Sequence, residues 1–244
     1  MSTLTLVVLI FLVAMVYASV GHGGASGYLA VLALAGYAPA QMSTSALLLN
    51  LLIAGTACVT FWRAGHGSWQ LLWPFLTTSG PCALLGGWMN VPPHAYQWFF
   101  AIVLLVAAGR LCLPMLPAAQ AVVSTEPSRS VAVPIGAGIG FISGIVGIGG
   151  GIFLSPLLVL CRWASPKQTA AVAACFIVVN SAAGLAGRLA AGRCEVGLLL
   201  PLAGVAFIGG WLGSRWGAGG FSNPVLCRIL ATVLAVAAMK GLVG

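Results

Sequence analysis

The chain has 244 residues, of which 61% are hydrophobic and only 5% are charged. Soluble domains carry roughly 25% charged residues, so this chain could not cover a water-facing surface, and it is predicted to be an all-α integral membrane protein. The ten Lys and Arg residues outnumber two acids and give a net charge of +8. These cations stand singly near the ends of apolar segments, which is typical of membrane topology and lipid headgroup contact and argues against a nucleic-acid partner.

Ten apolar segments follow one another along the chain, and each is a predicted helix. They lie at 4–20, 25–36, 40–62, 70–89, 95–113, 131–147, 152–161, 168–187, 196–214 and 225–243. Six of them are long enough to cross ~30 Å of hydrocarbon: 40–62, 70–89, 95–113, 168–187, 196–214 and 225–243. The two segments that flank each glycine cluster are shorter. The order short, short, long, long, long therefore occurs twice.

Sequence identities follow the same order and indicate an internal duplication. The glycine cluster at 21–25 matches that at 147–151 with an offset of 126 residues, and further matches continue at offsets of 127 and 130. The sequence between the copies holds three prolines and no strong apolar run, which is typical of a linker. We therefore predict an N-terminal transmembrane repeat at 1–113, an inter-repeat linker at 114–130 and a C-terminal transmembrane repeat at 131–244.

The relative orientation of the two repeats depends on how each glycine-centred pair is folded. If each pair is a hairpin, each repeat makes an odd number of crossings, the second copy is inverted, and the cations divide seven to three between the two sides. If each pair is one broken crossing, the repeats are parallel and the division is six to four. The positive-inside rule favours inversion, and the parallel arrangement stays open.

The glycine clusters predict a break in a helix at the middle of each hairpin. Consecutive glycines interrupt a helix, and broken backbone is tolerated in a membrane only where protein or water satisfies it. The helix that restarts after each break directs N–H groups and a partial positive charge toward that space, which suits a small anion. The alternative is that the glycines only allow close helix packing.

The positions of the acids and cysteines bear on the charge of the substrate and on whether a metal site or a disulfide is expected. Glu126 and Glu195 both fall outside the predicted spans, so a cation pathway would lack the buried carboxylate that such pathways use. The seven cysteines are widely spaced without a paired motif, which argues against a metal site and against disulfides. We therefore expect no metal and no cofactor.

One glycine cluster carries a specific resemblance. Residues 141–156 read Phe-Ile-Ser-Gly-Ile-Val-Gly-Ile-Gly-Gly-Gly-Ile-Phe-Leu-Ser-Pro, with a degenerate copy, Val-Gly-His-Gly-Gly-Ala, at 20–25. This pattern resembles the TauE/SafE family of membrane permeases over nearly the whole chain. The resemblance implies transport of small anions, typically sulfur-containing ones such as sulfite or organosulfonates like sulfoacetate, usually as exporters. His22 and Ala25 depart from the second copy, so the two halves of the site are chemically unequal.

Candidate substrate-binding residues lie in the glycine clusters and on the segment that follows each of them. Ser26 and Ser155 follow the breaks and could cap the restarting helices, while Arg188 is expected to reach the headgroups. His22 could donate to an anion or carry a proton. The predicted binding residues are His22, Gly23, Gly24, Ser26, Thr44, Ser45, Asn50, Gly149, Gly150, Gly151, Asn180 and Ser181.

Together these features predict a secondary transporter that moves a small anion by alternating access and is not an enzyme. A passive anion channel stays open, whereas an intramembrane enzyme would need a nucleophile with a base, a metal cluster or paired carboxylates. We expect a multi-pass protein of the cell inner (plasma) membrane whose partners are its anionic substrate and membrane lipid. A homo-oligomer is compatible with the sequence, which does not determine the oligomeric state.

Overall fold

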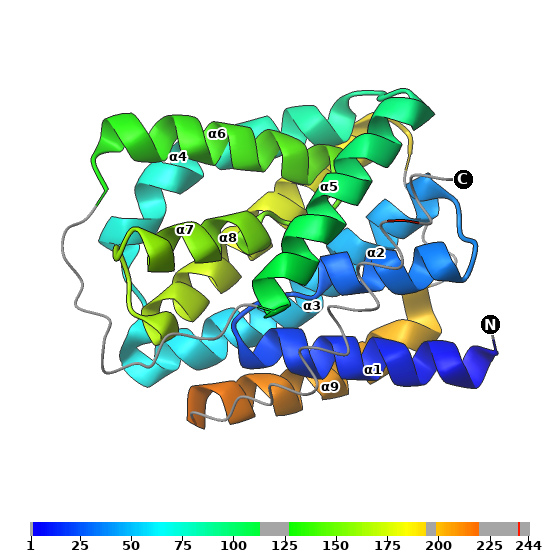
Figure 1. Ribbon diagram of the computed structural model, residues 1–244, viewed down its shortest axis with the longest axis horizontal. Helices are drawn as coiled ribbons and strands as arrows, with labels where there is room; N and C mark the ends of the chain where they lie inside the picture. The colour runs from blue at the N-terminus through cyan, green and yellow to red at the C-terminus, as the bar shows by residue number, and fades with distance from the viewer. Residues whose placement is uncertain (1, 113–126, 194–198, 220–238, 240–244) are drawn as a thin grey trace.

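The computed structural model describes residues 2–112, 127–193, 199–219 and 239, and it is helical in these ranges (Figure 1). Nine α-helices and one π-helical turn are assigned there: α1 Thr3–Ser19, α2 Ala25–Leu34, α3 Pro39–Phe61, η1 Trp62–His66, α4 Trp69–Trp88, α5 Pro93–Cys112, α6 Arg129–Val146, α7 Gly151–Leu160, α8 Pro166–Ala190 and α9 Leu199–Gly219. The predicted all-α class is confirmed. Most of the segment 225–243 and most of the linker 114–130, with Glu126, lie outside the described residues, as does Glu195.

Three described helices are long and apolar enough to cross a membrane: Gln41–His66, Arg129–Val146 and Pro166–Ala190. The third of the ten segments and the eighth were expected to span, but 131–147 was expected to be short, and that expectation is wrong. The helix there starts at Arg129 and has 18 residues. The expected spans 70–89, 95–113 and 196–214 are not among these three described helices. The helix α4 runs unbroken from Trp69 to Trp88, but its polar residues and two prolines lower its hydropathy.

The helices pack as two pairs on either side of a central pair. In Figure 1, α6 lies beside α4 along one side and α1 beside α9 along the other, with α3 and α8 between them. Both outer pairs approach backbone to backbone, because glycines on one helix face carbonyl groups on its partner. On α6 these are Gly136, Gly140 and Gly144 against Phe75, Ser79 and Ala83; on α9 they are Gly209, Gly213 and Gly217 against Phe11, Met15 and Ser19.

A disulfide joins the two central helices. Cys58 on α3 and Cys175 on α8 are bonded, with their Cα atoms 5.3 Å apart. The expectation that the cysteines form no disulfide is therefore wrong. The two partners are 117 residues apart in sequence, and only the packing of α3 on α8 brings them together, so their spacing gives no sign of the bond.

Candidate functional site

The chain leaves the helical conformation at both glycine clusters. Between α1 and α2, Gly21 and Gly24 have φ values of 76° and 89°; between α6 and α7, three glycines have φ values from 71° to 90°, namely Gly147, Gly149 and Gly150. These are left-handed conformations, which glycine adopts without the steric cost that a Cβ brings. The breaks predicted at 21–25 and 147–151 are confirmed.

The glycines of both clusters are also tightly packed. A Cβ on Gly23 would collide with the Asn50 side chain, and a Cβ on Gly149 would lie 2.7 Å from Ser181 Oγ and 2.9 Å from Asn50 Nδ2. Close packing and helix interruption are therefore properties of the same residues. Side chains from α3 and α8 occupy the space that the breaks open.

Asn50 on α3 connects the two breaks. Its Oδ1 accepts a hydrogen bond of 3.1 Å from the Ala25 N–H, and its Nδ2 donates to the Ile148 carbonyl at 3.1 Å and to Ser181 Oγ at 3.3 Å. The side chain is fully buried. Because Gly24 is the N-cap of α2 and has no side chain, Asn50 satisfies the first N–H of α2 in its place.

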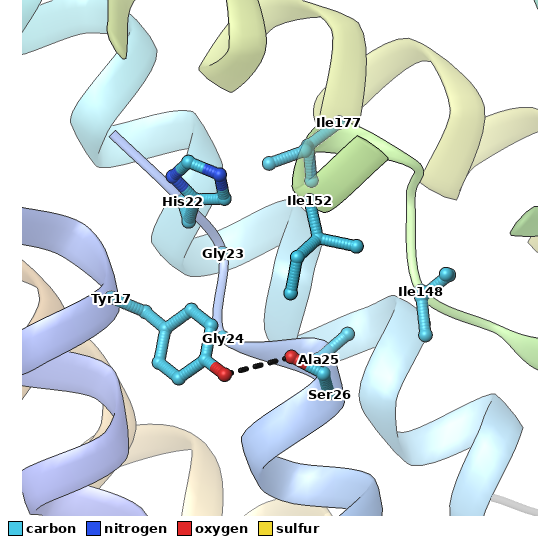
Figure 2. Close-up of a pocket in the computed structure, with 9 residues that line it drawn as sticks. All are labelled: Tyr17, His22, Gly23, Gly24, Ala25, Ser26, Ile148, Ile152 and Ile177. Atoms are coloured by element: carbon cyan, nitrogen blue, oxygen red, sulfur yellow. Dashed lines mark hydrogen bonds between the residues drawn. The ribbon is translucent and has the colours of Figure 1, made fainter. Parts of the chain in front are cut away.

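A small cavity lies beside the first break, between α1, α2, α7 and α8. It is lined by Tyr17, His22, Gly23, Gly24, Ala25, Ser26, Ile148, Ile152 and Ile177 (Figure 2). The space open to the centre of a water molecule is about 10 Å³, which is about enough for one water. An oxyanion therefore requires the walls to move apart.

Two buried hydrogen bonds order the polar side chains at this cavity. The Tyr17 hydroxyl and Ser26 Oγ are 2.9 Å apart, and His22 Nε2 and Ser155 Oγ are 3.0 Å apart. His22 Nδ1 lies 3.0 Å from the Val20 carbonyl, and since a carbonyl only accepts, Nδ1 carries a proton. In the neutral ring Nε2 therefore accepts from Ser155; in the charged ring Nε2 donates to it instead.

The predicted binding residues fall into three groups. His22, Gly23, Gly24 and Ser26 line the cavity. Beyond its wall, Gly149 and Ser181 contact Asn50, while Gly150 and Gly151 form the start of α7. The residues of the third group do not line the cavity: Thr44, Ser45 and Asn180.

These three residues are buried but make other contacts. Thr44 Oγ1 donates to the Arg193 carbonyl at 3.4 Å, and Asn180 Nδ2 donates to the Phe176 carbonyl of its own helix at 3.0 Å. The Ser45 hydroxyl has no hydrogen-bond partner within the described part of the chain. In this conformation none of the three lines the cavity.

Other polar residues contribute in ways that the sequence did not indicate. Ser155 does not cap α7, which has no side-chain cap, but pairs with His22. Arg188, expected at the headgroups, is only 5% exposed and donates to the Ile145 carbonyl at 2.7 Å. Ser43 donates to the Val146 carbonyl at 2.8 Å. Both stabilise the C-terminus of α6, where the break leaves carbonyl groups without helical partners.

Comparison with known proteins identifies the chain. The family described as "Sulfite exporter TauE/SafE" matches residues 6–241. This chain belongs to the TauE/SafE family. It is 34% identical over 241 residues to a protein of Sinorhizobium fredii (strain NBRC 101917 / NGR234) named "Probable membrane transporter protein y4hK", covering 96% of both chains.

A more distant relative supports the same assignment. "Probable membrane transporter protein YunE" of Bacillus subtilis (strain 168) is 26% identical over 158 residues, which cover 57% of this chain and 58% of the relative. No solved structure matches the chain. This TauE/SafE member is therefore a multi-pass membrane transporter and not an enzyme.

Proposed function

We propose that this TauE/SafE protein is a secondary transporter that exports a small anion, a sulfur oxyanion or an organosulfonate such as sulfite or sulfoacetate, across the cell inner membrane. The observation that carries the proposal is the cavity between the start of α2 and the second break. The helix start contributes a partial positive charge. His22, Tyr17, Ser26 and Ser155 contribute donors that can turn toward an anion.

The surroundings of the cavity suit a negative rather than a positive substrate. Among the described residues that line it there is no carboxylate, and such a group is the usual partner of a cation inside a membrane. His22 is the lining residue that can become positively charged. A single negative charge therefore has both a helix start and an imidazole as its partners.

Pairs of equivalent contacts support two repeats related by an approximate twofold axis. Gly86 packs on the Phe141 carbonyl and Gly213 on the Met15 carbonyl, and these pairs are related by the same offsets of 127 and 126 residues that align the two halves. In the same way Gly147 contacts Ser43 as Gly21 contacts Ala170.

The directions of the outer helices support inversion of the second repeat. In Figure 1, α1 runs from right to left along one side, and α6, its counterpart, runs from left to right along the opposite side. Inversion would let the two halves exchange conformations and expose the cavity alternately to each side. The small volume of the cavity favours such a carrier over a continuously open channel.

Flux measurements on the full chain in liposomes test this proposal. We expect uptake of labelled sulfite or sulfoacetate into proteoliposomes, with accumulation above the outside concentration when a proton or sodium gradient is imposed. Protein-free liposomes and dissipated gradients are the controls. Flux that only equalises the two concentrations under every gradient would indicate a channel. The absence of flux for sulfite, sulfoacetate, thiosulfate and sulfate would contradict the proposal.

A further inference from the structure

The two walls of the cavity have opposite chemistry. In Figure 2, Tyr17 and His22 lie on one side and Ile148, Ile152 and Ile177 on the other. All of these side chains are at least 94% buried. The polar wall belongs to the first half of the chain and is extended only by Ser155 of the second half. The apolar wall belongs entirely to the second half.

The apolar wall stands at the positions that correspond to polar residues of the first half. Ile148 lies 126 residues after His22, and Ile152 lies 126 residues after Ser26. Ile177 lies 127 residues after Asn50. These are the offsets that align the glycine clusters and the segments that follow them. Each of the three isoleucines therefore takes the place of a group that hydrogen-bonds in the first half.

We infer that this site takes a monovalent anion with a short apolar part, such as an alkanesulfonate, in preference to a bare oxyanion. The inference rests on the proposed transport function and specifies its substrate class. The anionic head lies against His22, Ser26 and the start of α2. The alkyl part lies against the three isoleucines.

Desolvation explains the preference. A sulfate dianion has acceptor oxygens on all sides, so those facing the isoleucines would lose their water without gaining a donor, which is costly in a buried site. A single His22 also provides at most one positive side-chain charge in the lining. An alkyl group on that side instead gains from leaving water. The walls come mostly from different halves, so their separation would enlarge the space between them without changing either surface.

A chain-length series on the wild-type protein tests this inference without any substitution. The probes are sulfate, sulfite, methanesulfonate, ethanesulfonate and 1-propanesulfonate, each competing for flux in proteoliposomes, with butyrate to compare a carboxylate head. We expect apparent affinity to rise about fourfold for each added methylene, with sulfate the weakest. Equal affinities along the series, or sulfate binding as tightly as 1-propanesulfonate, would overturn the inference while leaving the transport function in place. If none of the anions is carried, the transport function itself is wrong and the inference fails with it.

A matched pair of variants locates the effect. Ile152→Ser restores the hydroxyl that the first half has at Ser26, whereas Ile152→Val keeps the wall apolar. We expect Ile152→Ser to reduce the gain per methylene to less than about twofold, and Ile152→Val to retain most of it. The same gain in both variants would overturn the assignment of the alkyl part to this wall.

Discussion

The two helix breaks have the same backbone geometry but differ in their side chains. At the first break the His22 N–H bonds to the Tyr17 carbonyl at 2.8 Å, and at the second the Ile148 N–H bonds to the Ser143 carbonyl at 3.2 Å. Each break then ends in a left-handed N-cap glycine without a side-chain cap, followed by a ten-residue helix. Backbone geometry is therefore kept at both, and the chemical difference lies in what the next residues present.

The contacts around the breaks differ as well. Asn50 bonds to both of them from α3, while its counterpart on α8, Ile177, cannot form such bonds. The end of α6 is held by Ser43 and Arg188, whose donors come from two other helices. The comparison indicates that the second break presents an apolar surface held in place from α3 and α8, and that the first break presents polar side chains to the cavity.

The largest expected effect comes from adding a side chain at the second break. Gly149→Leu should abolish transport, because Gly149 has a φ of 71° and a Cβ there would lie 2.7 Å from Ser181 Oγ. The left-handed conformation costs a residue with a Cβ about 1–2 kcal/mol, and overpacking adds about 1–3 kcal/mol. Flux in proteoliposomes and the yield of membrane-inserted protein are the measurements.

Two control glycines separate local crowding from general damage. Gly36 also has a positive φ, and Gly138 lies within α6, but a Cβ on either would meet no atom within 4 Å. Gly36→Ala and Gly138→Leu should therefore retain most of the flux. Wild-type transport by Gly149→Leu would show that the second break tolerates rearrangement and has no strict role.

The next effect concerns the bridge between the breaks. Asn50→Leu leaves the Ala25 N–H and the Ile148 carbonyl buried without this partner, at about 1–3 kcal/mol for each group. We expect flux to fall at least about 30-fold, which corresponds to about 2 kcal/mol.

Asn180→Leu is the matched control for this bridge. Within the described part of the chain, the Asn180 amide donates only to the Phe176 carbonyl of its own helix. This variant should reduce flux much less. Equal losses in the two variants would mean that Asn50 matters as a buried amide and not as a bridge.

The glycine breaks and the helix order could be predicted from sequence because they follow from local rules. Glycine runs interrupt helices whatever surrounds them, and apolar runs indicate where the helices lie, although not which of them are long enough to span a membrane. The contacts of polar side chains follow from packing instead. Thr44 and Ser45 were chosen on α3, but it is the neighbouring Ser43 that reaches the second break. One residue changes the direction of a helical side chain by about 100°, and the sequence does not state which face meets α6.

Contacts between residues far apart in the sequence could not be predicted, for the same reason. Arg188 lies near the end of an apolar segment, where a basic residue usually reaches the headgroups. Its burial depends on the carbonyl groups left without helical partners at the end of α6. Arg188 bonds to one of them, that of Ile145, which lies 43 residues earlier in the sequence. Cys58 and Cys175 likewise meet only through the α3–α8 contact. Patterns within one segment could reveal neither pair.

The smallest expected effect concerns the chemical difference between the two breaks, where the first has His22 and the second has Ile148 at the equivalent position. Histidine is the side chain that ordinarily changes charge between pH 5 and 8, and a protonated ring would attract the anion that a neutral ring only hydrogen-bonds. Flux of methanesulfonate, which stays a monoanion over this range, should therefore rise severalfold as the pH falls from 8 to 5.5. His22→Gln keeps a donor but cannot titrate, so its flux should be nearly independent of pH.

The control for this pH profile is His94→Gln, because His94 is exposed on α5 and its Nε2 accepts a hydrogen bond of 3.1 Å from Trp98 Nε1. This variant should keep the wild-type pH profile. A profile in His22→Gln that still rises like the wild type would remove His22 from proton binding. Its side chain would then serve the site through hydrogen bonds such as those with Ser155 and the Val20 carbonyl, and the first break would differ from the second in polarity but not in charge.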